Sequence, residues 1–516
     1  MNIFLKITTV CVLANAIQLE SPAVAKSSQP NIVYILADDL GYGDVQAFNP
    51  KNGKIKTPNL DRLAARGMMF RDAHSGSSVC SPTRYGLLTG RYSWRTRMQS
   101  GVLNGFSPPL IPRDRLTVPA LLKQHGYATA CVGKWHLGMD WPKSPGTSFD
   151  PAGKVVPALS EIDWSRTISN GPTSLGFDYY FGISASLDMP PYVFIQNDQV
   201  TSVPTTEKKW IRSGPAAADF EAIDVLPTLT SKSIELIDGY ATDAHSGKPF
   251  FLYLALASPH TPVLPTPEWQ GKSGLGDYAD FVMQTDAAIG DVLAQLDKNR
   301  LTANTLVIVT SDNGFAPPGD PQSVLRKSGH LPSGPFRGSK ADIFEGGHRV
   351  PFIACWPAKI PAGTISDRTI CHTDLMATCA ELLKTPLPDN AGEDSFSFLP
   401  ALLGQLDTTN RPTIVNHSST GRFAIRVGNW KLSLCPGSGG WALPKDEEAL
   451  QQGLPPLQLY DLAKDPGEVT NLQATHPEIV GQLKVRLRTE IANGRSSPGT
   501  KQPNDVPIEI SAIASE

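Results

Sequence analysis

Cysteine is scarce in this chain of 516 residues, and its seven cysteines include no C-x-x-C pair. Such pairs are common ligands of structural zinc, so the sequence gives no sign of a zinc site. Cys11 lies in the N-terminal segment, and Cys80 belongs to a motif described below. The remaining five are odd in number and widely spaced, which is not typical of a disulfide framework. At most one or two bridges are expected among Cys131, Cys355, Cys371, Cys379 and Cys435.

The sequence also lacks an excess of charge of one sign. Lysine and arginine total 46 against 49 acidic residues, the formal net charge is −3, and no basic run stands out. This balance excludes the electrostatic footprint of a nucleic-acid-binding protein. The hydrophobic fraction of 40% and the charged fraction of 18% are ordinary for a soluble enzyme. Any selectivity for anions must therefore come from a local group of residues and not from the net charge of the chain.

No apolar run is long enough to span a bilayer, which argues against a membrane span. The N-terminus instead has the pattern of an export signal. Lys6 precedes the mostly apolar run 7–13, and small-x-small sites follow at 14–16 and 23–25. We predict that residues 1–25 are a signal peptide cleaved after Ala25, and that the exported protein is periplasmic or secreted.

Four apolar, β-rich runs each lead into residues that can carry chemistry. Runs that are apolar throughout, rather than alternating, are typical of strands covered on both faces in a parallel sheet. Because the carboxyl ends of such strands form one edge, the polar residues there are expected to share a single site. The runs are 32–37 before Asp38 and Asp39, 128–132 before Lys134 and His136, 250–257 before His260, and 306–309 before Asp312 and Asn313.

Helical patterns separate these strands. Segments 57–67 and 117–126 each begin with threonine and proline and end with glycine, and 278–296 has helical spacing. The alternation predicts an α/β fold with a large mixed, mostly parallel sheet sandwiched by helices. Paired glycines in 345–351 predict a structural tight turn before a strand over 350–355.

The alternation of apolar strands and helices ends after about residue 405. The predicted elements there are a β-hairpin over 423–427 and 430–434, a strand over 457–462 and a helix over 477–492. We therefore divide the mature chain into a catalytic α/β domain, residues 26–405, and a C-terminal α+β subdomain with an antiparallel sheet, residues 406–516. The tail from Ser496 is expected to be loose.

The most informative stretch is the run from Cys80 to Arg91, which places a cysteine and an arginine four positions apart at the start of a predicted helix. A Ser-Pro pair favours the helix start and a glycine its end. Backbone N–H groups and the helix dipole favour an anion there, and the Arg84 guanidinium offers it a planar fork of donors. A tyrosine-phosphatase loop is excluded, because C-x5-R needs an arginine where this chain has Gly86.

The same run matches the C-x-P-x-R and L-T-G-R pattern of type I sulfatases, the formylglycine-dependent branch of the alkaline phosphatase superfamily. Three further motifs resemble this family, one before this run and two after it. They are A-D-D-L-G-Y-G-D at 37–44, G-K-W-H-L-G at 133–138 and E-G-G-H-R-V-P at 345–351. The resemblance covers nearly the whole chain, and its C-terminal part is similar to arylsulfatase A and N-acetylgalactosamine-6-sulfatase. It implies an alkaline-phosphatase-like fold and a sulfuric ester hydrolase of arylsulfatase type.

Two residue pairs offer hard oxygen ligands, which suit Ca²⁺ or Mg²⁺ better than zinc: Asp38 with Asp39, and Asp312 with Asn313. Taken alone, each pair is more typical of a turn or a helix cap. The resemblance implies that all four, together with residue 80, bind one divalent cation, usually calcium rather than magnesium. It also implies that a formylglycine-generating maturation enzyme converts Cys80 to formylglycine (3-oxoalanine).

The resemblance further implies a mechanism. One oxygen of the hydrated formylglycine, a geminal diol, attacks sulfur and leaves a sulfo-enzyme intermediate on residue 80. The second hydroxyl then loses its proton, the aldehyde re-forms and sulfate leaves. Preorganised cations lower the barrier by stabilising charge on the sulfate oxygens. By motif position, Arg84 and Lys134 hold the nucleophile and the sulfate, His136 is the base, and His260 and Lys340 assist the leaving group.

For the substrate, the resemblance and the export signal favour an exo-acting enzyme on sulfated glycans, with galactose- or N-acetylgalactosamine-6-sulfate as candidates. Asp188 and His417 could bond sugar hydroxyls or merely cap turns. Five aromatic side chains could stack on a sugar or belong to the core: Trp135, Trp141, Trp164, Tyr192 and Trp441. Two alternatives stay open, a phosphonate monoester or phosphodiester hydrolase of the same superfamily, and a non-catalytic sulfoglycan-binding protein whose Cys80 is never oxidised.

Overall fold

The computed structural model describes residues 29–148, 150, 153–405 and 411–510. The predicted signal peptide, residues 1–25, and its cleavage site lie outside the described residues. Within those residues, no helix is both long enough and apolar enough to cross a membrane.

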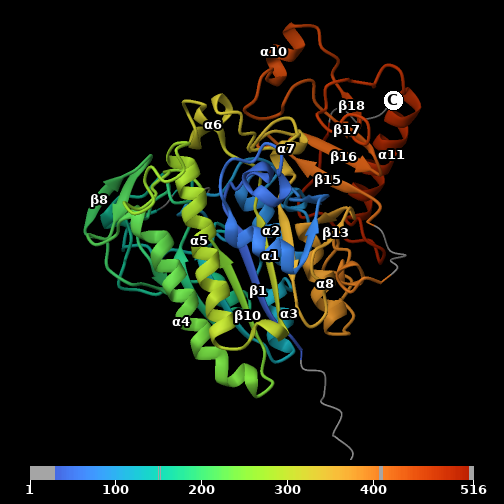
Figure 1. The fold of residues 1–516 in the computed structure, drawn as a ribbon. Coiled ribbons are helices and arrows are strands. Elements are labelled where there is room, and N and C mark those ends of the chain that lie inside the picture. The colour runs from blue at the N-terminus through green and yellow to red at the C-terminus, as the bar shows by residue number, and fades with distance from the viewer. Residues whose placement is uncertain (1–28, 149, 151–152, 406–410, 511–516) are drawn as a thin grey trace, which may run out of the picture.

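Four parallel strands form the centre of a ten-stranded sheet, and they correspond to the four runs that lead into polar residues. Two of them, β1 and β10, are labelled in Figure 1. Their order across the sheet is β11, β1, β10 and β4, and each pair of neighbours is parallel. Their bounds are Thr305–Ser311 for β11, Asn31–Ala37 for β1, Phe250–Ala255 for β10 and Ala128–Lys134 for β4. The predicted α/β class is confirmed, and the carboxyl ends of these strands form one edge.

Both faces of the sheet are buried at its central strands, which explains why these strands are apolar along their length. In β1, Ile32, Tyr34 and Leu36 pack into one core, whereas Val33 and Ile35 pack into the other. Successive side chains of a strand point to opposite faces, so a strand buried on both sides needs a continuous apolar run.

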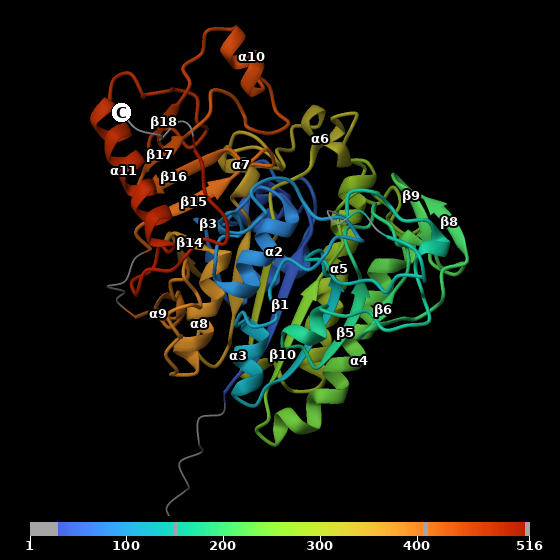
Figure 2. The same ribbon diagram turned by 180° about the vertical axis from the view of Figure 1, so that it is seen from behind.

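Helices cover the two faces of the sheet. Figure 1 shows α1, α4 and α5 on one face, and Figure 2 shows α2, α3 and α8 on the other. Their bounds are Pro58–Arg66 for α1, Cys80–Thr89 for α2, Val118–Gln124 for α3, Val225–His245 for α4, Asp277–Lys298 for α5 and Leu375–Leu382 for α8. The predictions over 57–67, 117–126 and 278–296 are confirmed as α1, α3 and α5, and α4 has no counterpart among the predicted helices.

Shorter strands complete the large sheet. β5 (Tyr179–Ile183) is parallel to β4 and is followed outward by β6 (Ile195–Gln196) and β7 (Gln199–Val200). On the other side β12 (Phe352–Cys355) is antiparallel to β11 and is followed by β2 (Met68–Phe70) and β13 (Thr364–Ser366). Outside the sheet lie the strand pairs β3 (Ala73–His74) with β14 (Ile370–Cys371) and β8 (Thr206–Lys209) with β9 (Ser213–Ala216), and the short helices α6 (Val324–Lys327) and α9 (Leu399–Leu402).

The segment 345–351 differs from the predicted turn. Residues Glu345–His348 form one turn of helix, α7, and β12 begins only at Phe352 rather than at residue 350. Pro351 precedes this strand and has no backbone N–H to donate, so pairing with β11 starts after it.

The C-terminal part forms an antiparallel sheet, as predicted, and its four strands lie in the order β15, β16, β17 and β18. The first of them, β15, has no counterpart among the predicted strands. The bounds are Ile414–His417, Phe423–Val427, Trp430–Ser433 and Gln458–Asp461, with helices α10 (Asp446–Gln451) and α11 (Pro477–Asn493). Gly428 enters the hairpin turn with a φ of 55°, which glycine adopts without strain. The predicted boundary between residues 405 and 406 adjoins a stretch outside the described residues and stays a prediction.

Residues 497–510, the part of the tail that the structure describes, pack against the rest of the chain, so the prediction that this part is loose is wrong. Asp505 donates its backbone N–H to Arg95 O at 2.8 Å, and its carboxylate accepts from Arg91 Nη2 at 3.0 Å. Both arginines are fully buried. A buried guanidinium needs acceptors for its five donors, and the tail supplies some of them.

The six cysteines among the described residues are all buried and free. The one or two bridges that the sequence allowed are therefore absent among these residues. Here the buried cysteines pack as small apolar side chains.

Candidate active site

The Cys80 side chain lies at the first residue of α2, at the carboxyl edge of the sheet. Its Sγ is 3.7 Å from Asp38 Oδ1, and Gly90 ends the helix with a φ of 66°. Burial outweighs the nearby lysines and raises the pKa of Cys80 to about 12, so the unmodified side chain is a neutral thiol at neutral pH. Attack by a cysteine thiolate, as in a tyrosine phosphatase, is therefore disfavoured.

The ends of β1 and β11 bring four oxygen-bearing side chains together. Asp39 donates its backbone N–H to Asp312 Oδ1 at 3.2 Å, and Asn313 Nδ2 donates to Asp39 Oδ1 at 2.8 Å. Asp39 has a φ of 66°, a left-handed conformation that costs a residue with a Cβ about 1–2 kcal/mol. These contacts offset that cost. Because Arg84 Nη2 pairs with both Asp312 and Asp38, the four residues form one cluster.

Each of the three carboxylates has a cation beside it. The pairs are Lys134 Nζ with Asp38 Oδ2 at 2.7 Å, Arg84 Nη2 with Asp312 Oδ2 at 2.9 Å, and Lys340 Nζ with Asp39 Oδ1 at 2.6 Å. Burial favours the neutral form of Asp38, but Lys134, His260 and Arg84 outweigh it and lower the pKa of this carboxyl. Asp38 is therefore ionised at neutral pH, and the three buried ion pairs create strong local fields suited to an anionic substrate.

His136 is held in one tautomer by a backbone carbonyl. Its Nε2 lies 2.7 Å from Leu103 O, which can only accept, so Nε2 carries the proton and Nδ1 carries the lone pair. Nδ1 is buried and has no hydrogen-bond partner among the described residues. Burial, and then the charges of Lys134 and Arg84, lower the pKa of His136 well below 6.5. A neutral imidazole with an unused lone pair can accept a proton.

His260 follows β10 and contacts a residue that the sequence did not reveal. Its Nε2 lies 3.2 Å from Ser186 Oγ and 3.5 Å from Asp39 Oδ2, while Lys134 Nζ donates to Ser186 Oγ at 2.7 Å. Ser186 follows β5, the fifth parallel strand of the sheet. The pattern that located the other residues, a strand leading into polar side chains, would have located Ser186 as well.

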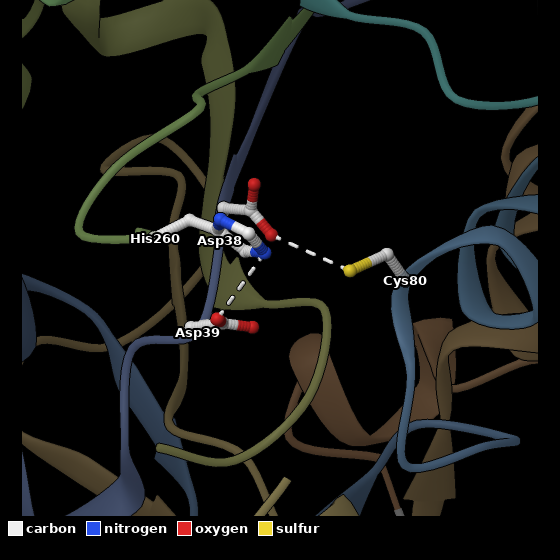
Figure 3. Close-up of side chains that lie close together, drawn as sticks. All are labelled: Asp38, Asp39, Cys80 and His260. Carbon is white, nitrogen blue, oxygen red and sulfur yellow. Dashed lines mark hydrogen bonds and ion pairs between the residues drawn. The ribbon is translucent and has the colours of Figure 1, made fainter. Parts of the chain in front are cut away.

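The oxygen-rich cluster fits a metal ion. The ligand atoms of Asp38, Asp39, Cys80 and His260 all lie within 4.8 Å of one another, and Figure 3 shows these side chains converging. Asn313 Oδ1 is buried and lacks a hydrogen-bond partner among the described residues. A buried amide oxygen left unpaired beside three carboxylates is a natural ligand for a hard divalent cation.

Comparison with known proteins assigns the chain to the same family as the motifs do. The family model described as Sulfatase matches residues 30–385, more than half of the chain. The chain belongs to the sulfatase family. It is therefore a sulfuric ester hydrolase, as predicted, of a family that uses formylglycine and a metal ion.

Similar proteins match the sulfatase over most of its length. An N-acetylgalactosamine-6-O-sulfatase of Bacteroides thetaiotaomicron is 36% identical, over 90% of this chain and 93% of that protein. Human arylsulfatase A is 33% identical, over 89% and 87% respectively. A solved structure described under metabolism of multiple glycosaminoglycans by Bacteroides thetaiotaomicron is 34% identical, with a TM-score of 0.78, over 90% of this chain and 99% of that one.

Four of the five aromatic side chains considered for sugar stacking belong to the sulfatase core. Trp135, Trp141 and Tyr192 are buried, and Trp164 is partly buried against the same side chains. Trp441 differs, because 46% of its surface is exposed on the loop that precedes α10. The core alternative is thus correct for the first four, and Trp441 alone of this set is open to a ligand.

The two candidate substrate-binding residues have different surroundings. Asp188 lies two residues beyond Ser186; one carboxylate oxygen pairs with Arg212, and the other, Oδ1, is buried without a partner among the described residues. His417 is buried, its ring packs on Phe423 with centroids 6.3 Å apart, and its carbonyl accepts from the backbone of the segment before Cys80. Asp188 therefore lies two residues from a side chain that contacts His260 and Lys134, whereas His417 adjoins the segment that leads into Cys80.

Proposed function

We propose that this sulfatase removes sulfate from a sulfated carbohydrate, acting on terminal galactose- or N-acetylgalactosamine-6-sulfate. The observation that carries the proposal is the 36% identity, over nearly the full length of both chains, to an N-acetylgalactosamine-6-O-sulfatase. The buried cations around Cys80 support an anionic substrate. Similarity to a solved structure whose description concerns glycosaminoglycan metabolism supports the same substrate class.

We propose that one Ca²⁺ ion binds to the oxygen-rich cluster formed by Asp38, Asp39, Asp312, Asn313 and residue 80. Figure 3 draws three of these residues, Asp38, Asp39 and Cys80. Such an ion supplies electrostatic stabilisation of the charge on the nucleophile and the sulfate group. Calcium suits the cluster better than magnesium, because it accepts about six to eight oxygen ligands in flexible geometry, whereas magnesium requires a strict octahedron.

Two buried cations would hold the reacting groups. Formylglycine at residue 80 supplies the geminal diol nucleophile, and Arg84 and Lys134 would orient it and bind the sulfate oxygens. The Arg84 guanidinium is itself fixed by Asp312 and by Lys134 O at 3.1 Å. Lys134 is fixed by Asp38 and Ser186. Because both cations are already oriented, little reorganisation is needed as charge develops on the sulfate.

Three further residues would move or share protons. His136 Nδ1, the unused lone pair, would accept the proton of the second hydroxyl at residue 80. Lys340 would donate a hydrogen bond to the bridging oxygen as it takes the electron pair of the breaking S–O bond. His260 would donate to it through Nε2 with both ring nitrogens protonated, since Nδ1 already donates to Thr261 O at 2.5 Å. His260 and Lys340 lie beside Asp39, whereas His136 is held through its Nε2 by the Leu103 carbonyl.

Asp188 is the residue we assign to sugar recognition. Its buried Oδ1 has no partner among the described residues and can accept from a sugar hydroxyl, while Arg212 holds the other oxygen. His417 is retained as a second candidate, because its carbonyl accepts from the Ser78 backbone N–H in the segment before Cys80.

The function is tested with a panel of sulfated monosaccharides and disaccharides that differ in sugar and sulfate position. We expect the highest kcat/KM for a terminal 6-sulfate of galactose or N-acetylgalactosamine. A sulfate and a phosphate ester of one phenol, assayed side by side, exclude the phosphonate or phosphodiester alternative if only the sulfate is cleaved. Binding of sulfated glycan without any hydrolysis, on protein whose Cys80 stays unmodified in a host that has the maturation enzyme, would contradict the proposal in favour of a binding protein.

Removal of the divalent cation should inactivate the enzyme. We expect chelation to lower kcat/KM by about 100-fold or more, since it removes a charge worth several kcal/mol in the transition state. Added Ca²⁺ should restore activity more fully than Mg²⁺ and should also raise the midpoint of thermal unfolding, because it binds only the folded cluster. Asn313→Ala should raise the Ca²⁺ concentration needed for both effects. An unchanged rate and an unchanged midpoint after chelation would refute the metal assignment.

We also propose that the protein is exported after maturation. The N-terminal pattern supports a signal peptide over residues 1–25, and the formylglycine-generating enzyme of the host is the partner that this chain requires. N-terminal sequencing of the exported protein should begin at Lys26, and an intact residue 1 on the exported protein would oppose this proposal.

A further inference from the structure

The segment that carries Lys340 is a junction between the large sheet and the C-terminal unit. Its backbone is fixed on both sides: Ala341 N donates to Ser78 O at 2.9 Å, in the segment before Cys80, and Ile343 N donates to Ser438 O at 2.8 Å. Ala341 has a φ of 79°, a conformation that residues with a Cβ rarely adopt. Such a conformation persists only where its surroundings impose it.

Asp342 supplies the contacts that impose this conformation. Its side chain is fully buried. Oδ2 accepts from Ser339 N at 2.9 Å and from Ser339 Oγ at 3.3 Å, which closes the turn that contains Lys340. Oδ1 accepts from the backbone N–H groups of Trp441 at 2.8 Å and Ala442 at 2.9 Å. One carboxylate therefore joins the Lys340 turn to a loop of the C-terminal unit.

The fit between the two segments is close. A Cβ added to Gly440 would lie 2.3 Å from Ala341 O and 2.6 Å from Asp342 Oδ1, so only glycine allows this approach. Lys340, directly before Ala341, extends from this turn to Asp39, with Nζ 2.6 Å from Oδ1. A change in the turn would thus move the ammonium group relative to the cluster around Cys80.

We propose that Asp342 is a positioning residue for Lys340: by clamping the 339–342 turn to the 441–442 backbone, it sets where the Lys340 ammonium meets the leaving group. This inference rests on the proposed role of Lys340. It gives the C-terminal unit a part in the reaction, because the loop that carries the exposed Trp441 also anchors the turn that carries Lys340.

The test compares two substrates whose leaving groups differ. A nitrophenolate leaves readily without help, whereas a sugar alcohol needs its developing negative charge stabilised. Asp342→Asn keeps the side-chain volume and one oxygen acceptor. Its amide nitrogen, in the place of Oδ2, cannot accept the hydrogen bonds that Ser339 donates. We expect it to lower kcat on a sugar 6-sulfate by about tenfold or more and kcat on nitrophenyl sulfate by less than about twofold, with KM little changed for either.

Two variants control this comparison. Asp446→Ala removes another carboxylate of the same region, which accepts from Gly437 N and Gly439 N and forms no hydrogen bond with the Lys340 turn among the described residues. It should affect both substrates equally or not at all. Lys340→Ala should show the same difference between substrates as Asp342→Asn, and its failure to do so would remove the proposed role of Lys340 itself.

A difference between substrates in Lys340→Ala without one in Asp342→Asn would overturn the Asp342 inference alone. Equal losses on both substrates in Asp342→Asn, with a lowered midpoint of thermal unfolding, would show a merely structural role and would also overturn it. Should Asp342→Asn not fold, Asp342→Ser, which keeps a single small acceptor, is measured against the same two outcomes.

Discussion

Replacing Cys80 with serine should reduce steady turnover by about a thousandfold or more, equivalent to about 4 kcal/mol in the barrier. A serine hydroxyl at this position can still displace the alcohol, since it would lie among the same buried cations as Cys80 Sγ. The sulfate ester of the introduced serine has no second hydroxyl to lose a proton, so it cannot re-form a carbonyl and expel sulfate. We expect at most one equivalent of alcohol per enzyme and a sulfated residue 80 in the mass spectrum.

The matched control is Cys379→Ser, which changes another buried cysteine, in α8 on the face of the sheet covered by α2 and α3. A serine there can bond the preceding helical turn, so folding and turnover should persist. Multiple turnovers by Cys80→Ser at a rate near that of the unaltered protein would refute the need for an aldehyde hydrate at residue 80.

Replacing His136 with alanine should slow sulfate release by about 10²–10⁴-fold, the usual contribution of a positioned base, and should slow alcohol release much less. The reason is that Nδ1 of His136 is the unused proton acceptor, whereas the alcohol departs on the side of His260 and Lys340. Single-turnover measurements of the two products separate these steps. Equal slowing of both products would count against the assigned role.

The pH dependence gives a second test of His136. Its pKa is lowered below 6.5, so the neutral form that acts as a base is present above that lowered value and is lost only below it. The rate of sulfate release should therefore stay constant as the pH falls through 6.5. His125→Ala, at the partly buried end of α3, is the matched control and should leave both release steps unchanged.

The sequence predicted which residues form the site better than it predicted the contacts between them. Runs that are apolar at every position predicted buried parallel strands, and the residues after them, such as Asp38 and Asp312, meet at one edge because parallel strands end together. Ser186 follows β5 in the same way, but this strand was not among the four apolar runs from which the site was predicted. The tail after Ser496 was wrongly predicted because its composition does not reveal that buried Arg91 and Arg95 need its acceptors.

By itself, the order of residues determined the fold class, the family and the types of chemical group at the site, since these depend on local patterns: the period of apolar residues and short motifs such as Cys80–Arg91. Only the tertiary structure decided which nitrogen of His136 is free, which carboxylate pairs with which cation, and that Asp342 joins Lys340 to the loop of Trp441. Those features depend on contacts between segments far apart in the chain, and no local pattern encodes a distance across the fold.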